Sequence, residues 1–190
     1  MKTLAARHDT FAKNFAHEVR ELNDPTLPTP VPEWTANDVV EHLLAWPVPV
    51  LSDWMGLDLA DDVTDSLASR WTTRSSELSE YLADPAVNST VVRKGPMAGQ
   101  TCAEVIDRIY TADVFMHTWD LARANSRTPD LDPDFANELL AGMKQMEQVL
   151  RDSGQYGPPI HTSSEDPVIQ LIAFIGRDPA WEPEAQNNRA

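Results

Sequence analysis

Apolar residues return every three or four positions along most of this chain, which is the spacing of one buried face of an α-helix. The pattern predicts helices over residues 3–22, 35–46, 61–83, 101–124 and 133–154. The apolar positions of the first helix are Leu4, Phe11, Phe15, Val19 and Leu22. The predicted fold is therefore all-α, a four-helix bundle with short accessory helices.

Capping residues and prolines predict where the first helices begin and end. The segment 24–34 contains four prolines and is predicted to be a connector. Thr35 has the N-cap position of the next helix, with Asp38 as its capping-box partner. Pro47 and Pro49 then break or kink this helix after residue 46.

The later helices have weaker but similar signals. The third helix opens with Asp61-Asp62, acidic side chains that the helix dipole favours in a first turn. Residues 87–100 are predicted to be irregular or briefly extended, and Thr101 caps the helix that follows. Pro133 fits the first turn of the last long helix, and residues 168–175 form a short apolar segment.

Composition limits the function classes. The chain has 190 residues, 42% hydrophobic and 24% charged, and we expect one domain over residues 1–181 followed by a polar tail, 182–190. The formal net charge of −15 opposes binding to nucleic acids and to anionic membranes, because both attract basic surfaces. The single cysteine, Cys102, cannot form an internal disulfide, so a reducing cytoplasm is the expected location. No apolar run has the length of a membrane span.

The helix predicted at 101–124 carries polar residues on its apolar face. At 100° per residue, Asp113, His117 and Asp120 fall in the stripe that should meet the core. A buried carboxylate must be paired, hydrogen-bonded or bound to a cation, because an unpaired one is very costly. Asp113 and His117 are four residues apart, so their side chains can reach one point. A carboxylate and an imidazole at this spacing form half of a possible divalent-metal site.

A third ligand is available on the helix predicted at 35–46. His42 lies there among apolar residues of the same face. Metal sites in helical bundles are built from side chains on facing helices. His42, Asp113 and His117 therefore make a candidate set of two histidines and one carboxylate, which leaves positions open for water or substrate.

Each of these polar residues also has an ordinary structural interpretation. Asp113 and His117 can form an ion pair on a helix, and His42 can be a hydrogen-bonded histidine at the edge of the core. Asp120 can accept a hydrogen bond from a ligand histidine, or point outward and pair with Arg123.

Two aromatic residues, Phe115 and Trp119, lie on the opposite side of the same helix, four residues apart. They either pack inside the chain, beneath residues 87–100 or 168–175, or form the surface of a homodimer. The pattern alone leaves both arrangements open.

Four segments of the chain add a further line of evidence. Residues 28–43 are PTPVPEWTANDVVEHL, residues 113–124 are DVFMHTWDLARA, residues 156–159 are YGPP, and residues 174–181 are FIGRDPAW. The first two resemble the PTPC-P-x-W-T-x-x-D-x-x-x-H-L and D/E-x-x-x-H-x-W-D-L-A-R-A stretches of the maleylpyruvate isomerase N-terminal-domain family, which are DinB-like, mycothiol-associated helical proteins. The last two resemble the closing GRDPxW region of its short, single-domain branch. Val31 stands where that family often has a cysteine.

This resemblance implies a DinB-like four-helix bundle that binds a divalent metal, zinc or nickel, through His42, Asp113 and His117. It also implies a mycothiol-dependent transferase or isomerase, with a small-molecule thiol and a small electrophile as partners. Arg123, on the same helix as His117, is a candidate contact for a carboxylate of the thiol or substrate. Two other functions stay open: a metal-dependent hydrolase, in which water replaces the thiol, and a non-enzymatic metal-binding homodimer.

Overall fold

The computed structural model describes residues 3–60 and 65–183. Those residues form ten α-helices and one π-helix: α1 (Leu4–Glu21), α2 (Ala36–Ala45), α3 (Pro47–Met55), α4 (Leu67–Ala83), α5 (Pro85–Asn88), α6 (Cys102–Val105), η1 (Ile106–Thr111), α7 (Ala112–Ala124), α8 (Pro133–Gln145), α9 (Glu147–Asp152) and α10 (Pro167–Phe174). Within the same residues there is no β-strand, only two isolated bridges, Pro28 with Thr35 and Val91 with Thr101. The predicted all-α class is confirmed. None of the helices described is long and apolar enough to cross a membrane.

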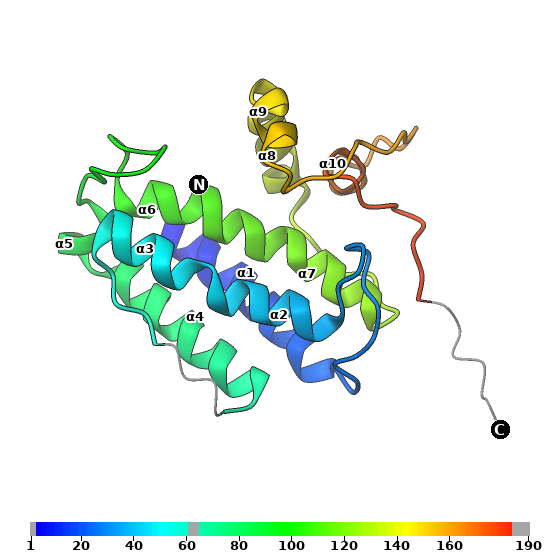
Figure 1. Ribbon diagram of the computed structural model, residues 1–190, viewed down its shortest axis with the longest axis horizontal. Helices are drawn as coiled ribbons and strands as arrows, with labels where there is room; N and C mark the ends of the chain where they lie inside the picture. Colours follow the sequence, from blue (N-terminus) through cyan, green and yellow to red (C-terminus); the bar gives the residue numbers. More distant parts are fainter. Residues whose placement is uncertain (1–2, 61–64, 184–190) are drawn as a thin grey trace.

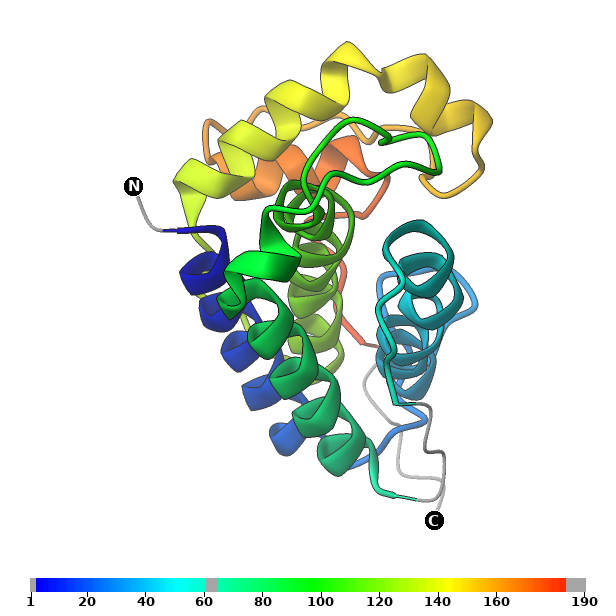
Figure 2. The same cartoon turned by 90° about the vertical axis from the view of Figure 1, so that its left-hand side faces the viewer.

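Four helices enclose the main core (Figure 1). Helix α1 packs against α4 and α7, and α2 packs against the same two helices, so the four form a closed ring of neighbours. Helices α8, α9 and α10 lie together on one side of this ring, as Figure 2 shows in yellow and orange. Phe135 of α8 joins the two parts, because its ring lies 4.9 Å from Phe11 of α1 and 5.0 Å from Phe115 of α7.

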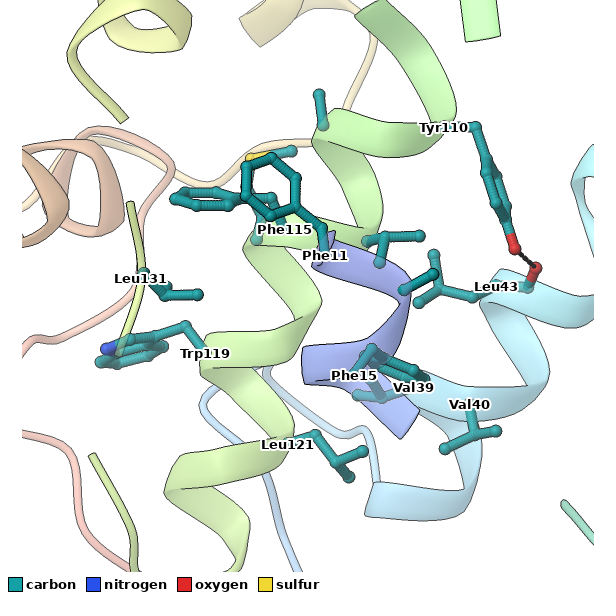
Figure 3. Close-up of a cluster of buried hydrophobic side chains, with 14 of the residues drawn as sticks. Phe11, Phe15, Val39, Val40, Leu43, Tyr110, Phe115, Trp119, Leu121 and Leu131 are labelled. Carbon is teal, nitrogen blue, oxygen red and sulfur yellow. Dashed lines mark hydrogen bonds between the residues drawn. The ribbon is translucent and has the colours of Figure 1, made fainter. Parts of the chain in front are cut away.

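The core explains where the two aromatic residues of α7 belong. Phe115 and Trp119 are both buried within the chain, and Figure 3 shows Leu131 beside Trp119. Their neighbours include Phe11 of α1 and Phe135 of α8, and the same hydrophobic cluster contains residues of the expected segment 168–175, namely Leu171, Ile172, Phe174 and Ile175. The two side chains therefore give no exposed surface for a homodimer.

The second helix begins and ends as the sequence predicts. The Thr35 side chain accepts from the backbone N–H of Asp38, and the Asp38 side chain accepts from the backbone N–H of Thr35, which completes the capping box. Helix α2 ends at Ala45, and α3 starts at Pro47 with that proline in its first turn. Pro47 therefore ends one helix and begins the next.

Two helix boundaries differ from the prediction. Helix α4 begins at Leu67, because the Ser66 side chain caps it by accepting from the N–H of Ser69. The expected start at Asp61-Asp62 lies outside the described residues, as do residues 184–190 of the expected tail. The helix predicted at 133–154 is interrupted at Met146, where the backbone leaves the helical region, giving α8 and α9.

The helix predicted at 101–124 is continuous but contains a π-helical turn. Thr101 caps it as expected, and η1 then separates α6 from α7. A π-helix closes its hydrogen bonds one residue later than an α-helix, so a fixed rotation of 100° per residue does not hold across residues 106–111. Helix α7 is also buried on most of its circumference, so its core contact is wider than a single stripe.

Candidate metal centre

The structure brings His42, Asp113 and His117 together between α2 and α7. Asp113 lies between the two imidazoles: its Oδ2 is 3.0 Å from His42 Nε2, and its Oδ1 is 3.5 Å from His117 Nε2. One possible ligand atom from each residue lies within 4.8 Å of the other two, so the three could hold a metal ion.

Contacts between the two helices fix this arrangement. Trp46, one turn after His42, donates a hydrogen bond from Nε1 to Asp113 Oδ2 at 2.9 Å. Tyr110, three residues before Asp113, donates from its hydroxyl to the Leu43 carbonyl at 3.0 Å. Both bonds join α2 to the α7 region beside the candidate ligands, so the spacing of these ligands is set by buried packing and hydrogen bonds.

The charges of the three groups are coupled. Burial raises the pKa of the Asp113 carboxyl, but the His117 charge and the hydrogen bonds from His42 and Trp46 outweigh burial and hold that pKa below its ordinary value. Burial lowers the pKa of His117, whereas Asp113 and Asp120 raise it, and the net direction is upward. Asp113 and Asp120 therefore place negative charge on both sides of the His117 ring, and this charge is balanced by the protonated imidazole or by a cation.

His117 is held from behind by Asp120. The Nδ1 atom of His117 lies 2.9 Å from Asp120 Oδ2. Asp120 in turn accepts from Arg177, at 3.2 Å from Nε to Oδ1 and 3.4 Å from Nη2 to Oδ2. Of the two positions considered for Asp120, the inward one beside the histidine is therefore confirmed, and its cationic partner is Arg177 in place of Arg123.

Aromatic side chains form the walls of the site. Trp34, in the loop before α2, lies nearly parallel to the His117 ring, at 14° and 5.8 Å, and its ring centroid is 5.0 Å from that of His42. Tyr156 is also close to Asp113. Burial, and then the negative charge of Asp113, raise the pKa of the Tyr156 hydroxyl to about 12. The His42 side chain is 31% exposed and that of His117 only 6%, so the site opens to solvent on the α2 side.

The donor atoms fit a divalent transition-metal ion. Imidazole nitrogen suits zinc and nickel, and a carboxylate adds negative charge. Three protein ligands leave positions open for a small molecule, as in catalytic zinc sites. The fixed Nδ1 contact of His117 is also what ligand histidines usually show, because the second nitrogen orients the ring.

The structure does not bring Arg123 into this cluster. Its guanidinium donates to the Trp181 carbonyl, from Nε at 3.1 Å and from Nη2 at 2.6 Å, so it holds the segment after α10. Its predicted contact with a thiol or substrate carboxylate stays a prediction.

Four side chains at the site were not assigned from the sequence. Trp46 had a usable signal, because it lies four residues after His42 on one helix. Trp34, Tyr156 and Arg177 lie in irregular segments, where periodicity carries no information about direction.

The chain is thus an all-helical protein with a candidate metal centre of two histidines and one carboxylate. It is 30% identical over 159 residues to two proteins of Mycobacterium tuberculosis, "Uncharacterized protein Rv0738" of strain H37Rv and "Uncharacterized protein MT0763" of strain CDC 1551. Each alignment covers 79% of this chain and 83% of the relative. The chain belongs to the same family as these mycobacterial proteins. No family model matches the sequence, and no solved structure matches it significantly.

Proposed function

We propose that this protein binds one divalent metal ion through His42, Asp113 and His117, in a DinB-like four-helix bundle, and uses it in thiol-dependent transfer or isomerisation of a small electrophile. The observation that carries the proposal is the convergence of these three side chains from two helices, with one ligand atom of each within 4.8 Å of the others. The resemblance of residues 28–43 and 113–124 to the maleylpyruvate isomerase N-terminal-domain family supports the thiol chemistry.

The residues around the centre have separate roles in this proposal. When bound, a divalent cation with an open position supplies Lewis acidity, which favours the thiolate form of a thiol at neutral pH. Trp46 holds the Asp113 carboxylate by a hydrogen bond, and Asp120 orients His117. Trp34 stacks on one face of the His117 imidazole, lies tilted beside His42, and limits the access of water there.

The thiol has to come from outside the chain. Cys102 is buried in a small cluster with Val92 and Val105, and burial raises the pKa of its thiol. Val31, close to Trp34 in sequence, offers no sulfur where the resembling family often has one. An external thiol, such as mycothiol, kept reduced in the cytoplasm, fits these observations best.

The test is metal loading followed by thiol addition. Wild-type protein should hold about one zinc or nickel ion per chain by elemental analysis, and His117→Ala should hold almost none. His161→Ala is the matched control, because His161 is exposed and outside the cluster, and its metal content should equal that of the wild type. Wild-type metal content in His117→Ala would refute the ligand assignment.

Cobalt-substituted protein separates the functions. Addition of a thiol should produce a sulfur-to-cobalt charge-transfer band, which neither of the two alternatives predicts. Absence of that band with hydrolytic activity would favour the metal-dependent hydrolase, and absence of both would favour a non-enzymatic metal-binding protein. A homodimer of that last kind would need a surface other than Phe115 and Trp119, because both are buried.

A further inference from the structure

Arg177 reaches the candidate metal centre from a distant part of the chain. It follows α10, and its guanidinium donates through Nε and Nη2 to the two carboxylate oxygens of Asp120, 57 residues earlier in the sequence. The side chain of Arg177 is 9% exposed and that of Asp120 is fully buried. A two-nitrogen contact between buried charges is directional as well as strong.

The local backbone aims Arg177 at this target. Helix α10 ends in a Schellman motif: the N–H of Gly176 donates to the Ala173 carbonyl, and the N–H of Arg177 donates to the Ile172 carbonyl. Gly176 has a φ of +86°, which suits glycine, and a Cβ there would lie 2.8 Å from the backbone of Gly157. The Gly-Arg order therefore turns the chain sharply and places the Arg177 side chain on α7.

The Asp120 carboxylate, held by Arg177, determines which nitrogen carries the hydrogen when the His117 ring is neutral. Both oxygens of Asp120 accept from Arg177, and Oδ2 also faces His117 Nδ1 at 2.9 Å. A carboxylate only accepts, so Nδ1 has to carry the hydrogen. In the neutral ring the lone pair is then on Nε2, the atom that faces Asp113 in the candidate site.

We propose that Arg177 is a positioning residue for the metal centre: by holding Asp120, it keeps His117 in the Nδ1–H tautomer, with Nε2 free to bind the metal. The metal part of this inference rests on the proposed function, whereas the tautomer part concerns the metal-free protein as well. Loss of the partner that orients a ligand histidine typically weakens metal affinity by about 10- to 100-fold.

The experiment compares Arg177→Gln with Arg151→Gln. Arg151 is the matched control because it also holds the end of α10, donating to the carbonyls of Phe174 and Gly157, but it does not contact Asp120. The two readouts are the imidazole ¹⁵N shifts of His117 in metal-free protein, taken above its raised pKa so that the ring is neutral, and the zinc dissociation constant from competition with a chelator. Arg177→Gln should lose the single Nδ1–H tautomer and bind zinc about 10- to 100-fold more weakly. Arg151→Gln should keep both wild-type values.

Wild-type behaviour of Arg177→Gln in either readout overturns the proposal, and so does an equal loss in Arg151→Gln. If Arg177→Gln does not fold, Arg177→Lys replaces it. Lysine keeps the positive charge, but its single ammonium nitrogen cannot reproduce the two-nitrogen contact with Asp120. A loss in both readouts then supports the proposal, and a wild-type value in either overturns it. If wild-type protein binds no zinc, the proposed function fails, while the tautomer comparison alone still decides the role of Arg177.

Discussion

The hydroxyl of Tyr110 satisfies the one backbone carbonyl that Pro47 leaves without a helical partner. Leu43 is four residues before Pro47, which has no N–H to donate, and the Tyr110 hydroxyl lies 3.0 Å from the Leu43 carbonyl oxygen (Figure 3). The carbonyl left free by the break between α2 and α3 is thus used for a hydrogen bond between α2 and the π-helical turn η1. Because His42 precedes Leu43, this contact fixes the side of α2 that carries the candidate ligand.

Tyr110→Phe should destabilise the protein by about 1–3 kcal/mol, because the Leu43 carbonyl then stays buried without a donor. Urea denaturation followed by circular dichroism measures the change. Tyr81→Phe is the control: the Tyr81 hydroxyl bonds to the Asp58 backbone near the surface, where water can replace it, so its effect should be within about 0.5 kcal/mol. Equal effects of the two substitutions would contradict this role of Tyr110.

Stability should fall in mild acid because of His8. His8 is fully buried, and burial, partly offset by the Asp9 charge, lowers its pKa from 6.5 to about 4. Between pH 6.5 and about pH 4, His8 therefore binds a proton in the unfolded chain but not in the folded protein. The contribution of neutral His8 to the free energy of unfolding is complete above pH 6.5 and is lost as the pH falls toward 4. This contribution is about 3 kcal/mol.

Urea denaturation of wild type and His8→Gln from pH 7 to pH 4 measures this contribution. The Nδ1 of His8 bonds to Thr111, and the substitution changes this bond at every pH, so each variant is compared with itself across pH. The His8→Gln profile should be flatter than that of the wild type over this range. The exposed His161, changed to Gln, should leave the wild-type slope unchanged, and a wild-type slope in His8→Gln would show that His8 is not the group responsible.

Removal of the metal should lower the melting temperature but leave the fold intact. A ligand that binds only the folded state stabilises it by about 2.7 kcal/mol at a free concentration 100 times its dissociation constant. For a chain of this size, that corresponds to roughly 5–10 °C. The main core contains none of the three candidate ligands, so circular dichroism should still show a helical protein after chelation. An unfolded chelated protein would mean that the metal is structural.

Much of the helical framework could be predicted because it depends on neighbours in sequence. Thr35 and Thr101 cap their helices through side chains three residues away, and such caps leave a local signature. The ligand cluster could also be predicted, because a carboxylate or imidazole inside an apolar stripe indicates an unusual environment without any knowledge of the fold.

What could not be predicted depends on contacts between distant segments. The sequence around Arg177 does not indicate that Asp120 is its partner, and nothing near Trp34 places its ring on His117. The π-helical turn over residues 106–111 could not be predicted from local propensity either, and the distant element that packs against it is α1. Periodicity left a homodimer surface and packing inside the chain both open for Phe115 and Trp119 for a similar reason: the ring contact that helps to bury Phe115 comes from Phe135 of α8, a distant helix.

The last prediction concerns the turn that aims Arg177. Gly176→Ala places a methyl group 2.8 Å from the Gly157 backbone and forces a non-glycine residue to a φ of +86°. Strain of this kind costs about 1–3 kcal/mol. The strain should be relieved by opening the turn after α10, which moves Arg177 away from Asp120. We therefore expect lower stability in urea together with weaker zinc binding.

Gly142→Ala is the matched control, with an effect of opposite sign. Gly142 lies in the exposed face of α8, its φ is ordinary, and a Cβ there would meet nothing within 4 Å. Alanine in a helix interior is more stable than glycine by about 0.5–1 kcal/mol, so this variant should gain stability and keep wild-type zinc affinity. Because both changes add one methyl group, the difference in sign isolates backbone conformation and local space as the cause. Wild-type stability of Gly176→Ala would show that the turn tolerates a side chain. A loss of stability with unchanged zinc affinity would show that the turn does not control the metal centre.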